Sequence, residues 1–236
     1  MAVTLIRGVN QADPGDNELF ARWQDKLANA KERTHARSDR RGALIEVAAQ
    51  HPLRDGLYPN AEFAARLDSA IALYRRVSEE EPGDVRIYVP GSVHMNNGIP
   101  DKVSLSKAGC NYLMEHGIEA GVLFGDDANE EFKGDAGVYN SSDECFVACK
   151  LFEKLGFGKL HCVCSPAQLL RKALSYITFG YVPLMHSVPC EDMFHSYVDE
   201  AFLYIPRLLE DNNGLQSDSL EADRLRSLRK PGFKHE

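Results

Sequence analysis

Three polar side chains follow one buried strand at a spacing that could build a binding site. Residues 163–171 read Val-Cys-Ser-Pro-Ala-Gln-Leu-Leu-Arg, which predicts a strand that leads directly into a helix with Ser165 at the junction. Gln168 and Arg171 follow at helical spacing and share one helix face. Open α/β sheets bind ligands at the carboxyl ends of their strands, and helix N-termini favour anions. We therefore expect a pocket here, with the Arg171 guanidinium facing it.

Three other polar loops also follow predicted strands. They are residues 50–56, residues 91–98 with Asp101 after them, and residues 125–129 running on to 139–144. Because parallel strands end at one rim, we expect the loops to converge into a single site. The candidate ligand-binding residues are Gly91, Ser92, His94, Asp126, Asn129, Ser142, Glu144, Ser165, Gln168 and Arg171.

Helix capping offers a structural alternative for the serines. Ser141 and Glu144 fit a capping box with Ser141 as the N-cap. Residues 165–168 fit another, with Pro166 at the favoured first helical position. Capping does not account for Arg171, which lies one turn further into the helix.

Catalytic and metal-binding interpretations of the remaining loops are less specific. Asp126 and Asp127 could bind Mg²⁺ together with Asn129, but they could also close a turn, which we favour. His94 could act as a general base if a carboxylate lies beside it. No complete dinucleotide-binding glycine pattern, P-loop or Gly-x-Ser-x-Gly elbow is present.

Composition narrows the class of protein. The chain has 236 residues, a 44% hydrophobic content and a formal net charge of −8. This charge argues against nucleic-acid or membrane-surface partners, and no apolar run approaches the roughly 18–20 residues that a membrane span needs. No signal-peptide core precedes Asp13, so we expect a cytoplasmic protein with a small-molecule ligand.

The cysteines favour a structural role. The six include Cys162 and Cys164 on one face of a strand and Cys145 and Cys149 one helical turn apart. A Cys-x-x-Cys pair, which would suggest a zinc site, is absent from the sequence. We expect these thiols to be small buried apolar groups.

Strand-like and helical patterns alternate through the middle of the chain, which predicts an α/β fold with a mostly parallel sheet flanked by helices. The helical stripes include Phe63, Leu67, Ile71 and Tyr74. Pro183 cannot donate to a ladder, so the last predicted strand is an edge strand. The predicted strands are residues 43–48, 85–89, 120–124, 160–164 and 181–185.

Helical additions are expected on both sides of this region. Residues 1–42 form an N-terminal extension whose Leu19, Phe20, Trp23 and Leu27 predict an amphipathic helix. Its basic residues between Lys31 and Arg41 are either a solvated helix end or a grip for an anion. The α/β domain spans residues 43–190, and residues 191–236 form a C-terminal helix and a polar tail.

The order of motifs resembles the YdcF/SanA/ElyC-like family over residues 43–186. The similarity rests on Ala-Ile-Ala-Leu-Tyr at 70–74, Gly-Ile at 117–118, Ser-Asp-Glu at 142–144 and the block at 163–173. It implies a Rossmann-like sheet with ligand-binding loops on its carboxyl rim. It also implies S-adenosylmethionine as a ligand, as in a soluble member; other members are tied to the cell envelope and its lipid-phosphate carriers.

Two departures from the family pattern affect the expected chemistry. Gln168 stands where the family has His, and Cys145 stands where it has Asn. Glutamine can hydrogen-bond a ligand but does not titrate, which favours binding or group transfer over hydrolysis. The leading hypothesis is a small-molecule binding protein or transferase that uses an adenosyl-type ligand.

Two other hypotheses remain open. One is a metal-assisted phosphoester or phospho-sugar enzyme with a divalent ion at Asp126, Asp127 and Asn129. The other is a noncatalytic partner protein that docks through its N-terminal helix around Trp23.

Overall fold

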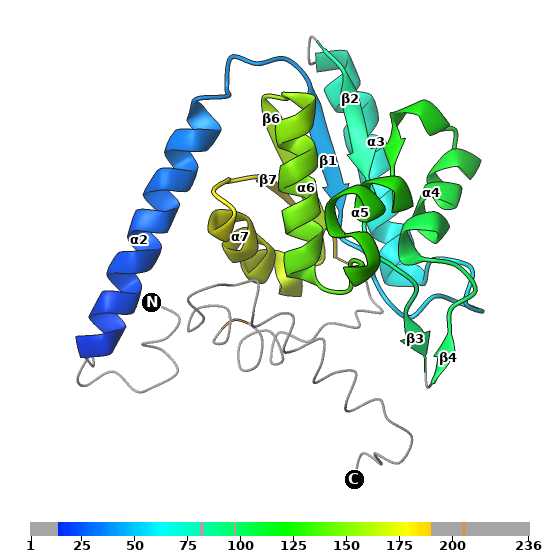
Figure 1. Ribbon diagram of the computed structural model, residues 1–236. Helices are drawn as coiled ribbons and strands as arrows, with labels where there is room; N and C mark the ends of the chain where they lie inside the picture. Colours follow the sequence, from blue (N-terminus) through cyan, green and yellow to red (C-terminus); the bar gives the residue numbers. More distant parts are fainter. Residues whose placement is uncertain (1–13, 81–82, 97, 190–204, 206–236) are drawn as a thin grey trace.

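The computed structural model describes residues 14–80, 83–96, 98–189 and 205, and within them the predicted α/β class is confirmed (Figure 1). Its centre is a five-stranded parallel sheet with the order β5-β2-β1-β6-β7. The strands are β1 (Ala43–Val47), β2 (Val85–Tyr88), β5 (Leu123–Phe124), β6 (Lys159–Cys164) and β7 (Leu184–Ser187). The sheet and its covering helices define a Rossmann-like fold.

The helices between the strands wind the chain in two directions. From β1 it runs through α3 to β2, and then through α4 to β5 at one edge of the sheet. It then crosses back through α5 and α6, so that β6 pairs with the other side of β1 and α7 leads to β7. The topological switch point, where such folds bind ligands, therefore lies between β1 and β6. The helices are α3 (Ala61–Glu80), α4 (Leu105–Glu115), α5 (Asp126–Lys133), α6 (Ser141–Leu155) and α7 (Leu169–Thr178).

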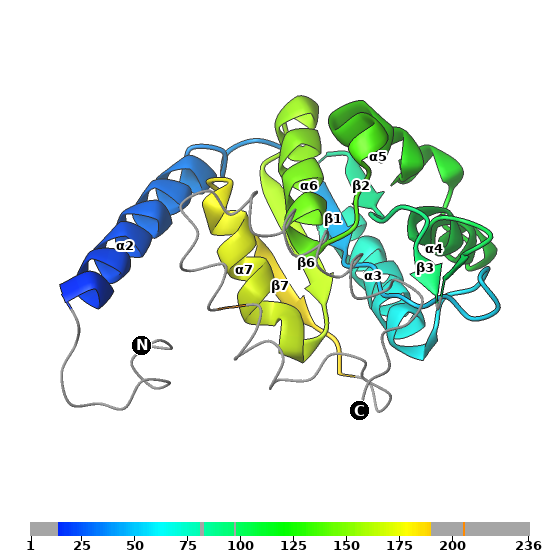
Figure 2. The same ribbon diagram turned by 60° about the horizontal axis from the view of Figure 1, so that its bottom comes forward.

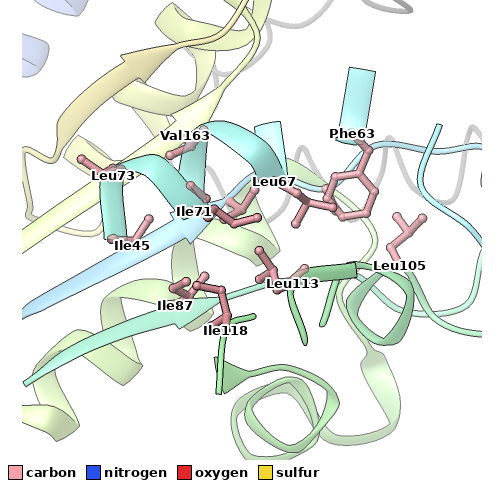
Figure 3. Packing of buried hydrophobic residues seen from close by; sticks show 14 of the residues in the cluster. Ile45, Phe63, Leu67, Ile71, Leu73, Ile87, Leu105, Leu113, Ile118 and Val163 are labelled. Carbon is pink, nitrogen blue, oxygen red and sulfur yellow. The ribbon is translucent and has the colours of Figure 1, made fainter. Parts of the chain in front are cut away.

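One face of the sheet packs on α3 and α4 (Figure 3). Ile45, Ile87 and Val163 point from three adjacent strands toward these helices. Phe63 and Leu67 belong to the apolar stripe of α3, where residues three and four apart share one side of the helix. The predicted stripe thus buries this helix face against the sheet.

The opposite face packs on α5, α6 and α7, which lie on the near side of the sheet in Figure 1. Cys145, Cys149, Cys162 and Cys164 are buried in this layer as free thiols, as predicted. Cys110 is half-buried, and Cys190 lies outside the described residues.

The N-terminal helix α2 (Pro14–His35) extends away from the sheet as an arm at the left of Figure 2. Its C-terminal end is anchored to α6: Arg33 pairs with Glu153 at 3.1 Å, and just after the helix Arg37 donates to the carbonyls of Phe152 and Phe157, both at 3.1 Å. Two of the basic residues therefore attach the arm to the domain, which neither sequence interpretation of the basic cluster foresaw.

Several boundaries differ from the sequence predictions. The strand predicted at 120–124 is reduced to the two residues of β5, because Ala120–Val122 forms a 3₁₀ turn. The edge strand begins after Pro183, which lacks an N–H. A short hairpin of β3 (Met95–Asn96) and β4 (Ile99–Pro100) was not predicted.

The predicted C-terminal helix and tail, residues 191–236, lie outside the described residues apart from Ile205. Among the helices that the structure does describe, none combines the length and apolar character needed to cross a bilayer.

Candidate functional site

A cavity of about 650 Å³ lies beyond the carboxyl ends of β2 and β5. This volume is within the range of small-molecule sites. Ser92 reaches the cavity from the loop after β2, and Asp126 and Asn129 reach it from α5, which begins directly after β5. Three candidate residues from two of the four predicted loops therefore line one cavity, whereas residues 50–56 and 165–171 do not line it.

The loop after β2 needs a glycine to form the wall of this cavity. Gly91 has φ +106°, and a Cβ on it would lie 2.7 Å from the Leu105 Cβ, so α4 packs directly on its backbone. Next to it, the Ser92 hydroxyl accepts from the Val138 N–H at 2.8 Å, and the Ser92 N–H donates to the Val138 carbonyl at 2.9 Å. These contacts fix the Ser92 side chain at the cavity.

The acidic pair starts a helix, so the predicted turn is wrong. Asp126 and Asp127 occupy the first turn of α5, where carboxylates are stabilised by the helix dipole. Asp126 accepts from the Ser104 hydroxyl at 2.8 Å and lines the cavity, whereas Asp127 accepts from the Gly125 N–H at 2.9 Å. No group of three His, Cys, Asp or Glu side chains in the described part of the chain could hold a metal ion.

Asn129 is the most informative side chain of the cavity. Its residue is 5% exposed, and its Oδ1 accepts from the Tyr88 hydroxyl at 2.6 Å. Its Nδ2 has no hydrogen-bond partner among the described residues. An unsatisfied buried donor costs about 1–3 kcal/mol. The Nδ2 group is therefore suited to a ligand that offers an acceptor.

Other polar lining residues were not selected from the sequence. Ser104 and Lys107 come from α4, where Ser104 is the N-cap and accepts from the Lys107 N–H at 2.8 Å. Glu130 and Asp135 add two more carboxylates. Ser104 is a favoured N-cap residue type, and nothing in the sequence around it indicates that this helix start faces the cavity.

His94 lies beside the cavity in a stack of rings. Its ring centroid is 5.0 Å from that of His51 and 5.5 Å from that of Tyr139, which lines the cavity. A carboxylate lies beside His51: the Asp101 Oδ2 is 3.7 Å from the His51 Nε2. Burial raises the pKa of Asp101.

The switch point itself is filled by the side chain of Arg66 from α3. This fully buried guanidinium donates to the carbonyls of Ala48 and Ala49, at 2.8 and 3.0 Å, and to the Gln50 Oε1 at 3.0 Å. It also contacts Glu62 and donates to the Ser165 hydroxyl, 2.7 Å from its Nη2. The crevice between β1 and β6 thus holds the chain's own cation.

Ser165 therefore belongs to this buried cluster, and its predicted capping box is wrong. Its hydroxyl donates to Glu62 and makes no cap hydrogen bond. Pro166 does take the first position of the 3₁₀ turn η3 (Pro166–Gln168), as predicted.

Glu144 belongs to a second buried cluster, none of whose members lines the cavity. The Lys172 Nζ lies 2.5 Å from both the Glu46 Oε1 and the Glu144 Oε2, and the Tyr176 hydroxyl donates to the Glu46 Oε2 at 3.1 Å. Burial raises the pKa of Glu144, and the Lys172 ammonium opposes this rise. Burial also opposes the charge of Lys172, but the negative charges of Cys145, when it is ionised, and of Glu144 and Glu46 outweigh it and hold the pKa of Lys172 above its ordinary value.

The capping box predicted at the start of α6 is displaced by one residue. Asn140 is the N-cap, and its Oδ1 accepts from the Asp143 N–H at 2.9 Å. Ser141 is the first residue of the helix, and Glu144 faces the buried cluster instead of the cap.

The remaining candidates do not line the cavity. Ser142, Gln168 and Arg171 are buried on α6, η3 and α7, and Arg171 is 8% exposed. The structure thus brings Ser92, Asp126 and Asn129 together, with Gly91 and His94 beside them, and places the residues of 163–171 next to the switch point.

Comparison of the chain with family models, curated proteins and solved structures finds no match. The fold and the site define the class: a Rossmann-like α/β protein with a polar cavity on the carboxyl rim of its sheet.

Proposed function

We propose that this chain binds an adenosyl-type small molecule in the rim cavity, with S-adenosylmethionine as the candidate ligand, either as a binding protein or as a group-transfer enzyme. The observation that carries the proposal is the buried Asn129 Nδ2, a donor without a partner among the described residues, in a cavity that it shares with the Asp126 carboxylate. Ring nitrogens of a base accept from an amide N–H, and ribose hydroxyls donate to a carboxylate.

The charges that line the cavity favour this ligand over a phosphorylated one. Asp126, Glu130 and Asp135 supply three carboxylates, against the single ammonium of Lys107. Such a lining repels phosphate groups and attracts a ligand with positive charge. S-adenosylmethionine carries a sulfonium and an ammonium that suit the carboxylates, and one carboxylate that suits Lys107.

The proposal assigns the cation that faces the ligand to Lys107, whereas the sequence analysis expects the Arg171 guanidinium to face the pocket. Lys107 lines the cavity and Arg171 does not, so Lys107 would hold the ligand carboxylate. The resemblance to the YdcF/SanA/ElyC-like family supports the same ligand, independently of the cavity.

The test is calorimetric titration of the chain with S-adenosylmethionine and S-adenosylhomocysteine. Asp126→Asn should weaken binding at least tenfold, because it removes the charge that faces the ligand. Asp127→Asn is the matched control: it makes the same change one residue away, at a side chain that does not line the cavity. The proposal fails if neither compound binds at millimolar concentration, or if both variants lose affinity equally.

A further inference from the structure

A second cavity, of about 410 Å³, lies between α3 and β7, away from the rim site. Its polar lining consists of Ser69 and Arg76 from α3 and His186 and Ser187 from β7. None of the described residues that line it is a carboxylate. The charge of its lining is therefore positive, whereas carboxylates predominate in the lining of the rim cavity.

Arg76 is the unused cation of this helix. Among the arginines of α3, Arg66 has its donors taken within the buried cluster, and Arg75 reaches the His116 carbonyl at 3.5 Å. Arg76 lines the cavity, and its fork of N–H groups makes no hydrogen bond or ion pair within the described part of the chain. Such a fork matches the oxygens of a phosphate or sulfate.

His186 adds a group whose charge can respond to a ligand. Its Nε2 lies 2.9 Å from the Nδ1 of His161 on β6, and the two rings stack with centroids 5.2 Å apart. Burial, and then the nearby Arg76, lower the pKa of His186. Among the described residues, the charged and titratable groups that face it are Arg76 from α3 and His161 from β6.

We propose that this cavity is a binding site for a small tetrahedral dianion of the phosphate type, either free phosphate or the phosphate of a monoester. The Arg76 guanidinium binds two of its oxygens, and the hydroxyls of Ser69 and Ser187 donate to the others. A bound dianion offsets the repulsion that Arg76 exerts on a protonated His186, so binding is accompanied by proton uptake. The site is independent of the rim cavity and of any ligand there.

The experiment is calorimetric titration with inorganic phosphate and, separately, with sulfate, at an ionic strength held constant with sodium chloride. Sulfate stays a dianion between pH 6 and pH 8, so it isolates the protonation of the protein. We expect saturable binding of both anions, and binding of sulfate that is at least threefold tighter at pH 6 than at pH 8.

The variants distinguish a specific binding site from the nonspecific attraction of an anion to any basic residue. Arg76→Gln should weaken the binding of both anions at least tenfold. Arg75→Gln is the matched control: it removes the neighbouring arginine, which does not line the cavity, and should change the affinity less than twofold. His186→Gln should remove the pH dependence of sulfate binding. The proposal is overturned if the wild-type chain shows no saturable binding, or if Arg75→Gln and Arg76→Gln weaken binding equally.

Discussion

Replacing Lys172 by Met should destabilise the fold by about 4 kcal/mol at pH 7. The ammonium makes charge-assisted hydrogen bonds to Glu46 and Glu144, both 2.5 Å long, in a fully buried position. Two such bonds contribute about 3–6 kcal/mol together, and removing one partner of a buried ion pair costs about 3–5 kcal/mol. Methionine fills most of the volume of the lysine stem, so a new cavity adds little to this loss.

The same variant should make the stability depend on pH. Burial already raises the pKa of Glu144, and Lys172 opposes the rise. Without the ammonium the folded-state pKa rises further above the unfolded value, so the folded state retains a proton that the unfolded state releases. The free energy of unfolding then falls as the pH rises between these two pKa values. We therefore expect a smaller loss at pH 5 than at pH 8.

Urea denaturation followed by circular dichroism at pH 5, 7 and 8 measures both effects. Lys150→Met is the matched control, because the Lys150 ammonium forms an exposed pair with Glu153 at 3.5 Å, and such pairs contribute up to about 1 kcal/mol. Adding Glu144→Gln to the Lys172→Met variant should recover part of the stability. A loss below about 1 kcal/mol for Lys172→Met, or the same loss at pH 5 and pH 8, would refute the reasoning.

Two further predictions concern local structure. Asn140→Ala should lower the free energy of unfolding by about 1 kcal/mol because it removes the cap of α6, and Ser141→Ala should cost less than half as much; the reverse order in urea denaturation would restore the cap expected from the sequence. Arg37→Met should release the C-terminal end of α2 and speed amide hydrogen exchange there, because two hydrogen bonds to carbonyls are lost. Arg40→Met, which has no such bonds, should leave the exchange of α2 unchanged.

The central strands and their helices could be predicted because their patterns are strong. All five residues of β1 are buried, as are five of the six in β6. Apart from Glu46 and His161 these buried residues are apolar, and such nearly continuous apolar runs are typical of parallel strands covered on both faces. The helix α5 is not predicted because Asp-Asp-Ala-Asn-Glu-Glu-Phe-Lys has only two apolar residues, Ala128 and Phe132, which are too few to define an apolar stripe. At α6, Asn140 and Ser141 are equally good caps, and only the packing of the helix selects between them.

The site was harder to predict, because long-range contacts decide where each charge lies. The sequence predicts Arg171 as the functional cation of its helix, but its neighbour Lys172 faces the buried carboxylates. An arginine and a glutamate one turn apart, such as Arg66 and Glu62, usually indicate a solvated helix face. Their position beside Phe63 and Leu67, on the apolar side of α3, was the available signal that this pair is buried.

The two edge strands of the sheet affect how readily the protein self-associates at high concentration. In the part of the chain that the structure describes, the sheet ends beyond β2 in a strand of only two residues, β5, and beyond β6 in a strand of four residues, β7, that follows a proline. An exposed edge strand can pair with a strand of a second molecule through its unpaired N–H and C=O groups, and a short edge strand has few of these groups. Self-association through strand addition is therefore disfavoured at both edges of the sheet. This limits the aggregation to which the apolar central strands would be prone if they were exposed.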